Sequence, residues 1–273
     1  MLTRNERPSG RILLATNEIP AEYHVDRLRW WTINSPSWST HIDADQNRNA
    51  MLAKLAQKAV DLIGPKQTPV VADLGCGEGA FLRALGRLAP AASLLGIDFC
   101  PAMLGEAKRR AADQCMTFTL GDLEEPGFAA PSDVDLVTSI LAMDEMDQLE
   151  VAFRNIARAL VPGGVALLVV MDPVREMERN RGDLASFVRA EERPDDAVLL
   201  VKTFPTAPGV APAAPYSRIV RPLSQYLTAA RAADLQPAPV EQWAHTVGVG
   251  VFSDTLLFDV MVFRKVDRAA TMG

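Results

Sequence analysis

The sequence predicts an α/β fold, a doubly wound sheet of mostly parallel strands with helices on both faces. Short apolar segments typical of buried strands recur at residues 70–74, 93–97, 116–120, 134–141 and 165–171. Helical patterns lie between most of them, and a glycine-rich turn follows the first. Strands that alternate with helices imply a parallel sheet, and such sheets bind ligands beyond the carboxyl ends of their strands.

The glycine-rich turn spans residues 73–79 and reads Asp-Leu-Gly-Cys-Gly-Glu-Gly. Its glycines allow positive φ and a close approach to a ligand, and the following helix offers unpaired N–H groups at its N-terminus. The spacing also fits the dinucleotide fingerprint G-x-G-x-x-A. Asp73, however, would add negative charge beside a pyrophosphate. It suits a ligand that carries an ammonium group.

The second strand ends at Asp98. An acid about 20 residues past the glycines is placed to accept hydrogen bonds from ribose hydroxyls. A ligand with an amine at one end and a ribose beside it is S-adenosylmethionine (SAM). Asp122 and Leu141 also fall at strand ends, so four segments are predicted to face one crevice.

Four segments, in order, resemble the motifs of the class I SAM-dependent methyltransferases of small-molecule type. They are the glycine turn, residues 96–104 (Gly-Ile-Asp-Phe-Cys-Pro-Ala-Met-Leu), residues 120–123 (Leu-Gly-Asp-Leu) and residues 159–165 (Ala-Leu-Val-Pro-Gly-Gly-Val). The resemblance implies a seven-stranded Rossmann-like sheet with an antiparallel last strand. It also implies methyl transfer from SAM to a small organic acceptor, with S-adenosylhomocysteine (SAH) as product. A role in specialised, natural-product metabolism is expected.

The resemblance implies roles for the residues that match the motifs. Asp73 would hold the SAM amine directly or through water, against the alternative that it shapes the glycine turn. Asp98 would accept the ribose hydroxyls, against the alternative of a solvated strand-end acid. Asp122 and Leu123 would lie at the adenine edge.

Four further residues complete the expected cofactor site. Phe99 and Met103 are candidates to flank the adenine, although Met103 also fits a helix core. Arg48 could meet the SAM carboxylate or be a solvated arginine at a helix start. Trp31 could line an aromatic pocket or pack the N-terminal helices. The predicted cofactor-binding set is Trp31, Arg48, Asp73, Gly75, Cys76, Gly77, Gly79, Asp98, Phe99, Met103, Gly121, Asp122, Leu123 and Leu141.

Methyl transfer needs alignment of the reactants more than acid–base chemistry, since the sulfonium is already activated. A base is needed only for a protonated acceptor. The candidates are Asp144 and Glu145 after the fourth strand, together with His41 and His245. The two acids also fit a helix start, and a lone histidine is more often structural. The sequence shows no metal-ligand spacing, so no metal is predicted.

Five segments are expected along the chain. Residues 1–47 form an N-terminal lid, 48–172 the SAM-binding core, 173–221 a substrate cap insertion, 222–265 the rest of the core sheet and 266–273 a tail. Within the cap, a helix is expected over residues 183–192 and strands over 198–202 and 216–220. Residues 241–247 and 256–265 are expected to be the last two core strands.

Composition narrows the function classes. The chain has 273 residues, of which 48% are hydrophobic, and a net charge of −6. Such a charge disfavours a nucleic-acid partner, and the longest apolar run, residues 165–171, is too short to span a membrane. Three cysteines without paired or metal-binding spacing indicate a cytoplasmic protein, and a homodimer is compatible with the sequence. Three alternative functions stay open: an NAD-dependent oxidoreductase, a non-catalytic SAM-binding protein and an RNA methyltransferase.

Overall fold

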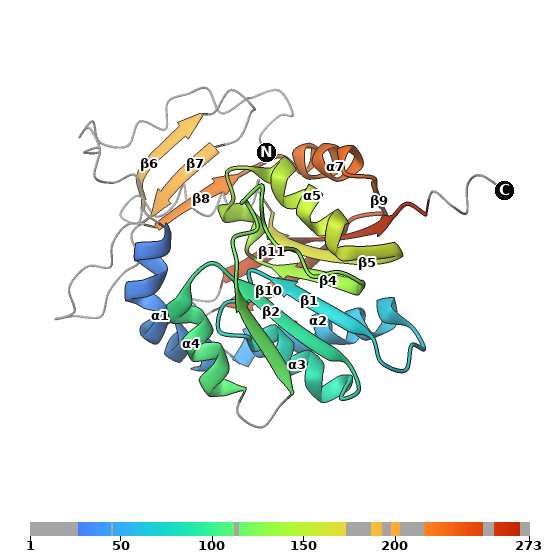
Figure 1. Ribbon diagram of the computed structural model, residues 1–273. Coiled ribbons are helices and arrows are strands. Elements are labelled where there is room, and N and C mark those ends of the chain that lie inside the picture. Colours follow the sequence, from blue (N-terminus) through green and yellow to red (C-terminus); the bar gives the residue numbers. More distant parts are fainter. Residues whose placement is uncertain are drawn as a thin grey trace.

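The computed structural model describes residues 27–44, 46–111, 115–172, 187–192, 198–202, 216–247 and 254–267. In its main sheet, seven strands follow the order β10-β11-β5-β4-β1-β2-β3, and a short eighth strand, β9, pairs with β11 (Figure 1). The strands are β1 (Val70–Leu74), β2 (Ser93–Asp98), β3 (Met116–Leu120), β4 (Val134–Ile140), β5 (Leu160–Met171), β9 (Leu235–Pro237), β10 (Glu241–Val247) and β11 (Asp254–Lys265).

Strand directions confirm the predicted fold class. Strands β1 to β5 pair with their neighbours in parallel. Strand β11 is antiparallel to β5, and β10 is antiparallel to β11. The structure is therefore a doubly wound α/β sheet with an antiparallel last strand, as the sequence predicts.

Two helical layers cover the sheet, one on each face (Figure 1). Helices α2 (Gln46–Ile63), α3 (Ala80–Leu88) and α4 (Pro101–Arg110) contribute to one hydrophobic cluster, and α5 (Leu149–Ala159) and α7 (Leu223–Ala232) contribute to the other. Successive residues of β1 alternate between the clusters: Val71 belongs to the first, Ala72 and Leu74 to the second. This alternation is why the core strands are apolar on both faces.

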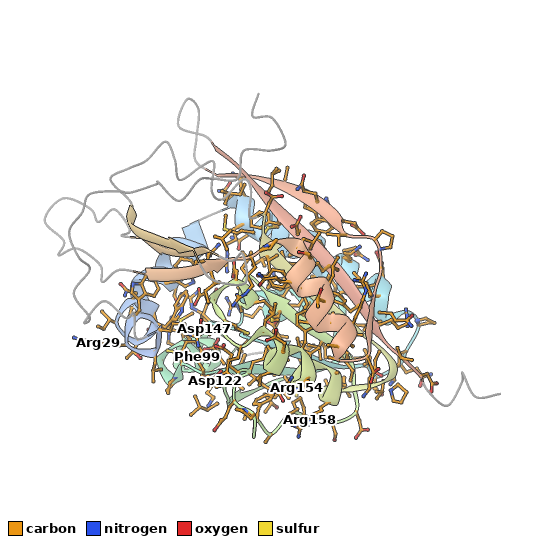
Figure 2. The ribbon with its side chains drawn as sticks, turned by 90° about the horizontal axis from the view of Figure 1, so that it is seen from above. Arg29, Phe99, Asp122, Asp147, Arg154 and Arg158 are labelled. Atoms are coloured by element: carbon orange, nitrogen blue, oxygen red, sulfur yellow. The ribbon has the colours of Figure 1, made fainter. Side chains whose placement is uncertain are left out.

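The helices form where the sequence supplies an apolar stripe and suitable ends. In α5, Leu149, Phe153 and Ile156 are buried, whereas Arg154 and Arg158 are exposed and project outward in Figure 2. Helix α4 starts with a proline at its first position and carries three basic residues in its last turn, which the helix dipole favours.

The segment expected to form a substrate cap contributes a second, three-stranded antiparallel sheet. Its strands are β6 (Phe187–Glu192), β7 (Val198–Lys202) and β8 (Tyr216–Val220). The expected helix over residues 183–192 is wrong for 187–192, because this segment pairs along its length with β7. Residues 183–186 lie outside the described residues.

Helix α1 (Arg27–Ala44) lies beside α4 and also contacts β8 (Figure 1). Trp31 stacks edge-on against Trp30 and Trp38, with ring centroids 4.8 and 5.3 Å apart. No helix among the described residues is long and apolar enough to cross a membrane.

Candidate functional site

The glycine turn has the backbone conformation that its composition predicts. Gly75, Gly77 and Gly79 have φ values of 76°, 54° and 75°, which side-chain-bearing residues rarely adopt. A Cβ atom on Gly75 would lie 2.5 Å from the Cβ of Ala142. The turn is therefore pressed against the segment that follows β4, and only glycine fits there.

Asp98 connects the glycine turn to the second strand. Its Oδ2 accepts the Gly77 N–H at 2.8 Å and its Oδ1 accepts the Cys100 N–H at 2.9 Å. The N–H groups of Gly75 and Cys76 donate to the Ile97 carbonyl. The pKa of Asp98 is raised to about 6, chiefly by burial; the two hydrogen bonds oppose this shift, and the charges of Glu78 and Asp122 add to it.

Asp73 is buried near the end of β1. Burial raises its pKa to about 7, the charges of Asp98 and Glu78 add to the shift, and a hydrogen bond from Thr138 opposes it. That bond, from the Thr138 hydroxyl to Oδ1, is 2.7 Å long. Three buried acids therefore repel one another around the turn. Such a site suits a positively charged ligand.

Glu78, the third buried acid, was not among the predicted site residues. Its Oε1 lies 3.6 Å from Nη1 of Arg48, the residue expected to meet the SAM carboxylate. Its position inside the glycine turn was the one feature of the sequence that could have identified Glu78 as a site residue. Cys76 is buried as well, and burial raises the pKa of its thiol well above the usual value, so it is no nucleophile.

The residues expected around the adenine gather after β2 and β3. Met103 is buried, and a Cβ on Gly77 would come 3.2 Å from its methyl carbon. Leu123 is buried, and the Gly121 N–H donates to the Asp98 carbonyl. Figure 2 shows Phe99 and Asp122 on the side of the molecule where α1 lies.

Arg27 connects α1 to the rim of the crevice, which is formed by the segments that follow β2, β3 and β4. Its guanidinium lies 5.7 Å from the Phe99 ring centroid, pairs with the buried Glu124 and donates to the Glu145 carbonyl at 2.6 Å. Glu124 also accepts the Gln148 N–H at 2.5 Å. Arg27 and Glu124 carry no motif signal, which is why sequence reasoning missed them.

The segment after β4 contains Leu141 and the two acids proposed as bases. Leu141 has a φ of 60°, which is strained for a residue with a side chain, and its N–H donates to the Val169 carbonyl. A short 3-10 helix, η2 (Met143–Glu145), follows. Glu145 Oε2 accepts a hydrogen bond from the Trp31 indole N–H at 2.9 Å. Glu145, a predicted base, is therefore bonded to Trp31, a predicted cofactor-binding residue.

Asp144 is buried and faces β8. Its Oδ2 lies 3.0 Å from Arg218 Nη1 of β8. Arg221, at the start of the segment that leads into α7, is buried beside it and donates from Nη2 to the Asp147 carbonyl at 3.2 Å. Sequence reasoning assigned no role to either arginine. The remaining base candidates, His41 in α1 and His245 in β10, have side chains that lie outside the described residues.

Comparison with known proteins agrees with this geometry. Residues 71–164 match the family model of a methyltransferase domain. A nocamycin O-methyltransferase from Saccharothrix syringae is 32% identical over 114 residues, 40% of this chain and 40% of the relative. A trans-aconitate 2-methyltransferase from Escherichia coli O157:H7 is 31% identical over 140 residues, 50% of this chain and 51% of the relative. The chain thus spans about half the length, or less, of these relatives.

A solved structure shares the fold across most of the chain. It is a SAM-dependent methyltransferase from Clostridium acetobutylicum, with a TM-score of 0.55 and 13% identity, covering 87% of this chain and 99% of that one. The motifs at the strand ends, the matched domain and the shared fold lead to one family. Residues 71–164 of the chain match a methyltransferase domain, and its motifs and fold are similar to those of the class I SAM-dependent methyltransferases.

Proposed function

We propose that this chain transfers a methyl group from SAM to a small organic acceptor. The observation that carries the proposal is the ring of buried acids at the glycine turn. Asp73, Glu78 and Asp98 are all buried there; burial raises the pKa of Asp73 and Asp98, and the charges of neighbouring acids add to both shifts. SAM carries an ammonium and a sulfonium, two positive charges that this rim would stabilise, whereas NAD carries a pyrophosphate that it would repel.

The chain's own residues suggest how the cofactor would be held. Asp98 can accept ribose hydroxyls while it braces Gly77, and Asp73 can accept the ammonium directly or through water. Gly121, Asp122 and Leu123 would lie at the adenine edge, with Phe99 and Met103 on its faces. When bound, SAM supplies a methyl group that is already activated for displacement.

The acids after β4 support a role in alignment. Asp144 is paired with Arg218 and Glu145 accepts from Trp31, so both carboxylates already have partners. Asp144 thereby holds β8, and Glu145 holds α1, against the crevice. Holding donor and acceptor in line can supply roughly 7–11 kcal/mol of the barrier reduction.

The acceptor is proposed to be a small organic molecule. The relatives named above act, by their names, on nocamycin and trans-aconitate, and the acidic balance of this chain, −6, disfavours RNA. A role in natural-product metabolism fits the first of these names.

We further propose that residues 1–47 act as a lid and 173–221 as a substrate cap.

A cytoplasmic location and a homodimer remain proposals. The three cysteines are unpaired, and two of them, Cys76 and Cys100, are buried, as suits a reducing compartment. Light scattering on the purified chain would test the dimer.

Titration calorimetry with SAM and SAH tests the central proposal. We expect micromolar binding of both, no comparable binding of NADH, and labelled methyl transfer to some member of a small-acceptor panel. Absence of SAM and SAH binding at about 1 mM, a free energy weaker than about −4 kcal/mol, contradicts it. Binding without transfer to any acceptor would instead favour a non-catalytic SAM-binding protein. Tight, salt-dependent RNA binding would favour an RNA methyltransferase.

A further inference from the structure

The neighbouring strands β1 and β4 carry a polar pair at the end that leads into the crevice. The strands are parallel, and their register pairs Val71 with Leu136, Ala72 with Val137 and Asp73 with Thr138. The first two pairs are buried and apolar. The third pair is buried as well but polar, and it lies where β1 leads into the glycine turn. A polar pair at this one position of the ladder indicates a role beyond packing.

Thr138 donates the only hydrogen bond that the Asp73 carboxylate receives from a described residue. The Thr138 hydroxyl lies 2.7 Å from Oδ1, a length typical of a hydroxyl that donates to an ionised carboxylate. Thr138 is 0% exposed and Asp73 is 2% exposed. The second oxygen of Asp73, Oδ2, receives no hydrogen bond from a described residue. Oδ2 is therefore the oxygen that is left for a ligand.

The other surroundings of Asp73 disfavour its ionised form. Burial raises its pKa most, and the charges of Asp98 in β2 and Glu78 in the glycine turn add to that shift. Arg48 of α2 lies on the same side and pairs with Glu78. The Thr138 hydroxyl opposes the shift in pKa, because a donor to a carboxylate favours the charged form. Thr138 thus helps to keep Asp73 in the state that a cation requires.

A cofactor ammonium needs Asp73 to be both ionised and correctly oriented. Thr138 is β-branched, which restricts its χ1 and so fixes the direction of its hydroxyl. We propose that Thr138 is a positioning residue, which holds Oδ1 of Asp73, leaves Oδ2 for the ammonium and sets the pH above which the cofactor binds. This inference rests on the proposed function, since it concerns the cofactor of the same site.

The first test is calorimetry of SAH binding to the wild-type chain between pH 5.5 and pH 8.5. Asp73 must lose its proton before it can pair with the ammonium. SAH affinity should therefore fall by up to about tenfold per pH unit below a midpoint of about 7. At pH 6.5, titrations in buffers of low and high ionisation enthalpy should show release of more than about half a proton per SAH bound. An affinity that does not change with pH, or no release of protons, overturns the proposal.

Two variants of Thr138 then assign the pH dependence to its hydroxyl. Thr138→Val replaces the hydroxyl with a methyl group, so the midpoint should rise by about one pH unit. SAH affinity at pH 6.5 should then fall about tenfold or more. Thr138→Ser keeps the hydroxyl and should keep the midpoint within about 0.3 pH units of wild type. A hydroxyl with a merely structural role would lower the affinity equally at every pH, so an unmoved midpoint in Thr138→Val overturns the proposal.

Ser139→Ala is the matched control. Ser139 is the next residue of β4 and is also 0% exposed, but its side chain points to the opposite face of the sheet, because successive residues of a strand alternate. Its Oγ has no hydrogen-bond partner among the described residues. Removing this hydroxyl should leave both SAH affinity and the midpoint unchanged, and an equal rise in midpoint would contradict a specific role for Thr138. Thr138→Cys, whose thiol is a weaker donor, should also raise the midpoint and replaces Thr138→Val if that variant does not fold.

The two proposals fail in different ways. If SAH binds at no pH, the proposed function fails, and the role of Thr138 falls with it. If SAH binds but its pH dependence is the same in wild type and in the folded Thr138→Val or Thr138→Cys variant, only the role of Thr138 is wrong.

Discussion

At the scale of single residues, Asp73 is expected to stabilise the bound state and destabilise the ligand-free protein. Its pKa is raised from 3.8 to about 7, chiefly by burial. A raised pKa in the folded state means that the folded chain holds its proton more tightly than the unfolded chain. Stability is therefore lost as the pH rises through this window. The ionised form, however, is the one that a cationic ligand requires.

Asp73→Asn should separate these two effects. The amide can still accept the Thr138 hydroxyl, but it never ionises. Between pH 5 and pH 8, the stability gain of the variant over wild type should grow by on the order of 1–3 kcal/mol, since each unit of pKa shift corresponds to about 1.36 kcal/mol. Urea unfolding at the two pH values measures it, and SAM affinity at pH 8 should fall.

The matched control for this pair of measurements is Asp133→Asn. Asp133 is exposed and has a φ of 61°, a conformation that asparagine tolerates well. Its stability difference from wild type should stay constant with pH. A gain for Asp73→Asn that is equally constant would contradict the assigned pKa.

Gly75 gives a second test at the residue scale. Gly75→Ala places a methyl group 2.5 Å from the Ala142 Cβ at a φ of 76°, so the turn or the segment after β4 must move. We expect SAH affinity to fall at least about tenfold and stability to drop by about 1–3 kcal/mol. Calorimetry and urea unfolding measure the two effects.

Gly105→Ala is the contrasting variant. Gly105 lies in α4, is exposed, and has nothing within 4 Å of an added Cβ. This change should raise stability by about 0.5–1 kcal/mol, since alanine is the better helix former, and leave SAH binding unaltered. Equal losses in both variants would show that the glycine turn is not special.

At the scale of elements, helix α1 is held to the rim by a few long-range polar contacts. Arg27 reaches Glu124 and the Glu145 carbonyl, and Trp31 donates to the Glu145 side chain. All of these partners lie around the adenine side of the crevice or just after β4. We propose that helix α1 acts as a lid whose contacts set the rate at which the cofactor leaves.

Arg27→Gln tests this role. The variant loses the charge pair with the buried Glu124, which then lacks its nearest cation. We expect SAH to dissociate about tenfold faster or more in stopped-flow measurements, because one partner of a buried pair is removed. Lys108→Gln, an exposed charge change in α4, should leave the rate unchanged. An unaltered rate in Arg27→Gln would mean that α1 does not cover the cofactor.

Helices and strands could be predicted from the sequence where they depend on a pattern of nearby residues. The strand before the glycine turn and the stripe of α5 each depend on neighbours within a few residues, and both appear as expected. Strand β6 lies in a segment that was expected to be helical, and its residues Ala190, Glu191 and Glu192 are good helix formers. Pairing with β7 overrides that preference. Arg27 and Glu124 escaped prediction for the same reason: their contacts join segments 97 residues apart.

At the scale of the whole molecule, the sheet is buried between two hydrophobic clusters, and its rim collects acids from several separate strands. Each cluster includes residues of β1, β2, β4, β5 and β11 together with helices from one layer. A ligand that bridges the ends of β1 and β2 should therefore stabilise the whole cooperative unit and not just one loop. This coupling makes thermal unfolding a direct report on cofactor binding.

SAH at about a hundredfold its dissociation constant should stabilise the folded chain by about 2.7 kcal/mol. For a chain of this size, that corresponds to a rise in Tm of about 5–10 °C. NADH at the same concentration should give no comparable rise, since its pyrophosphate would meet Asp73, Glu78 and Asp98. Gly105→Ala should retain the SAH-induced shift and Gly75→Ala should lose most of it. A larger shift with NADH than with SAH would contradict the proposed cofactor, because the buried acids at the rim would then be accommodating negative charge.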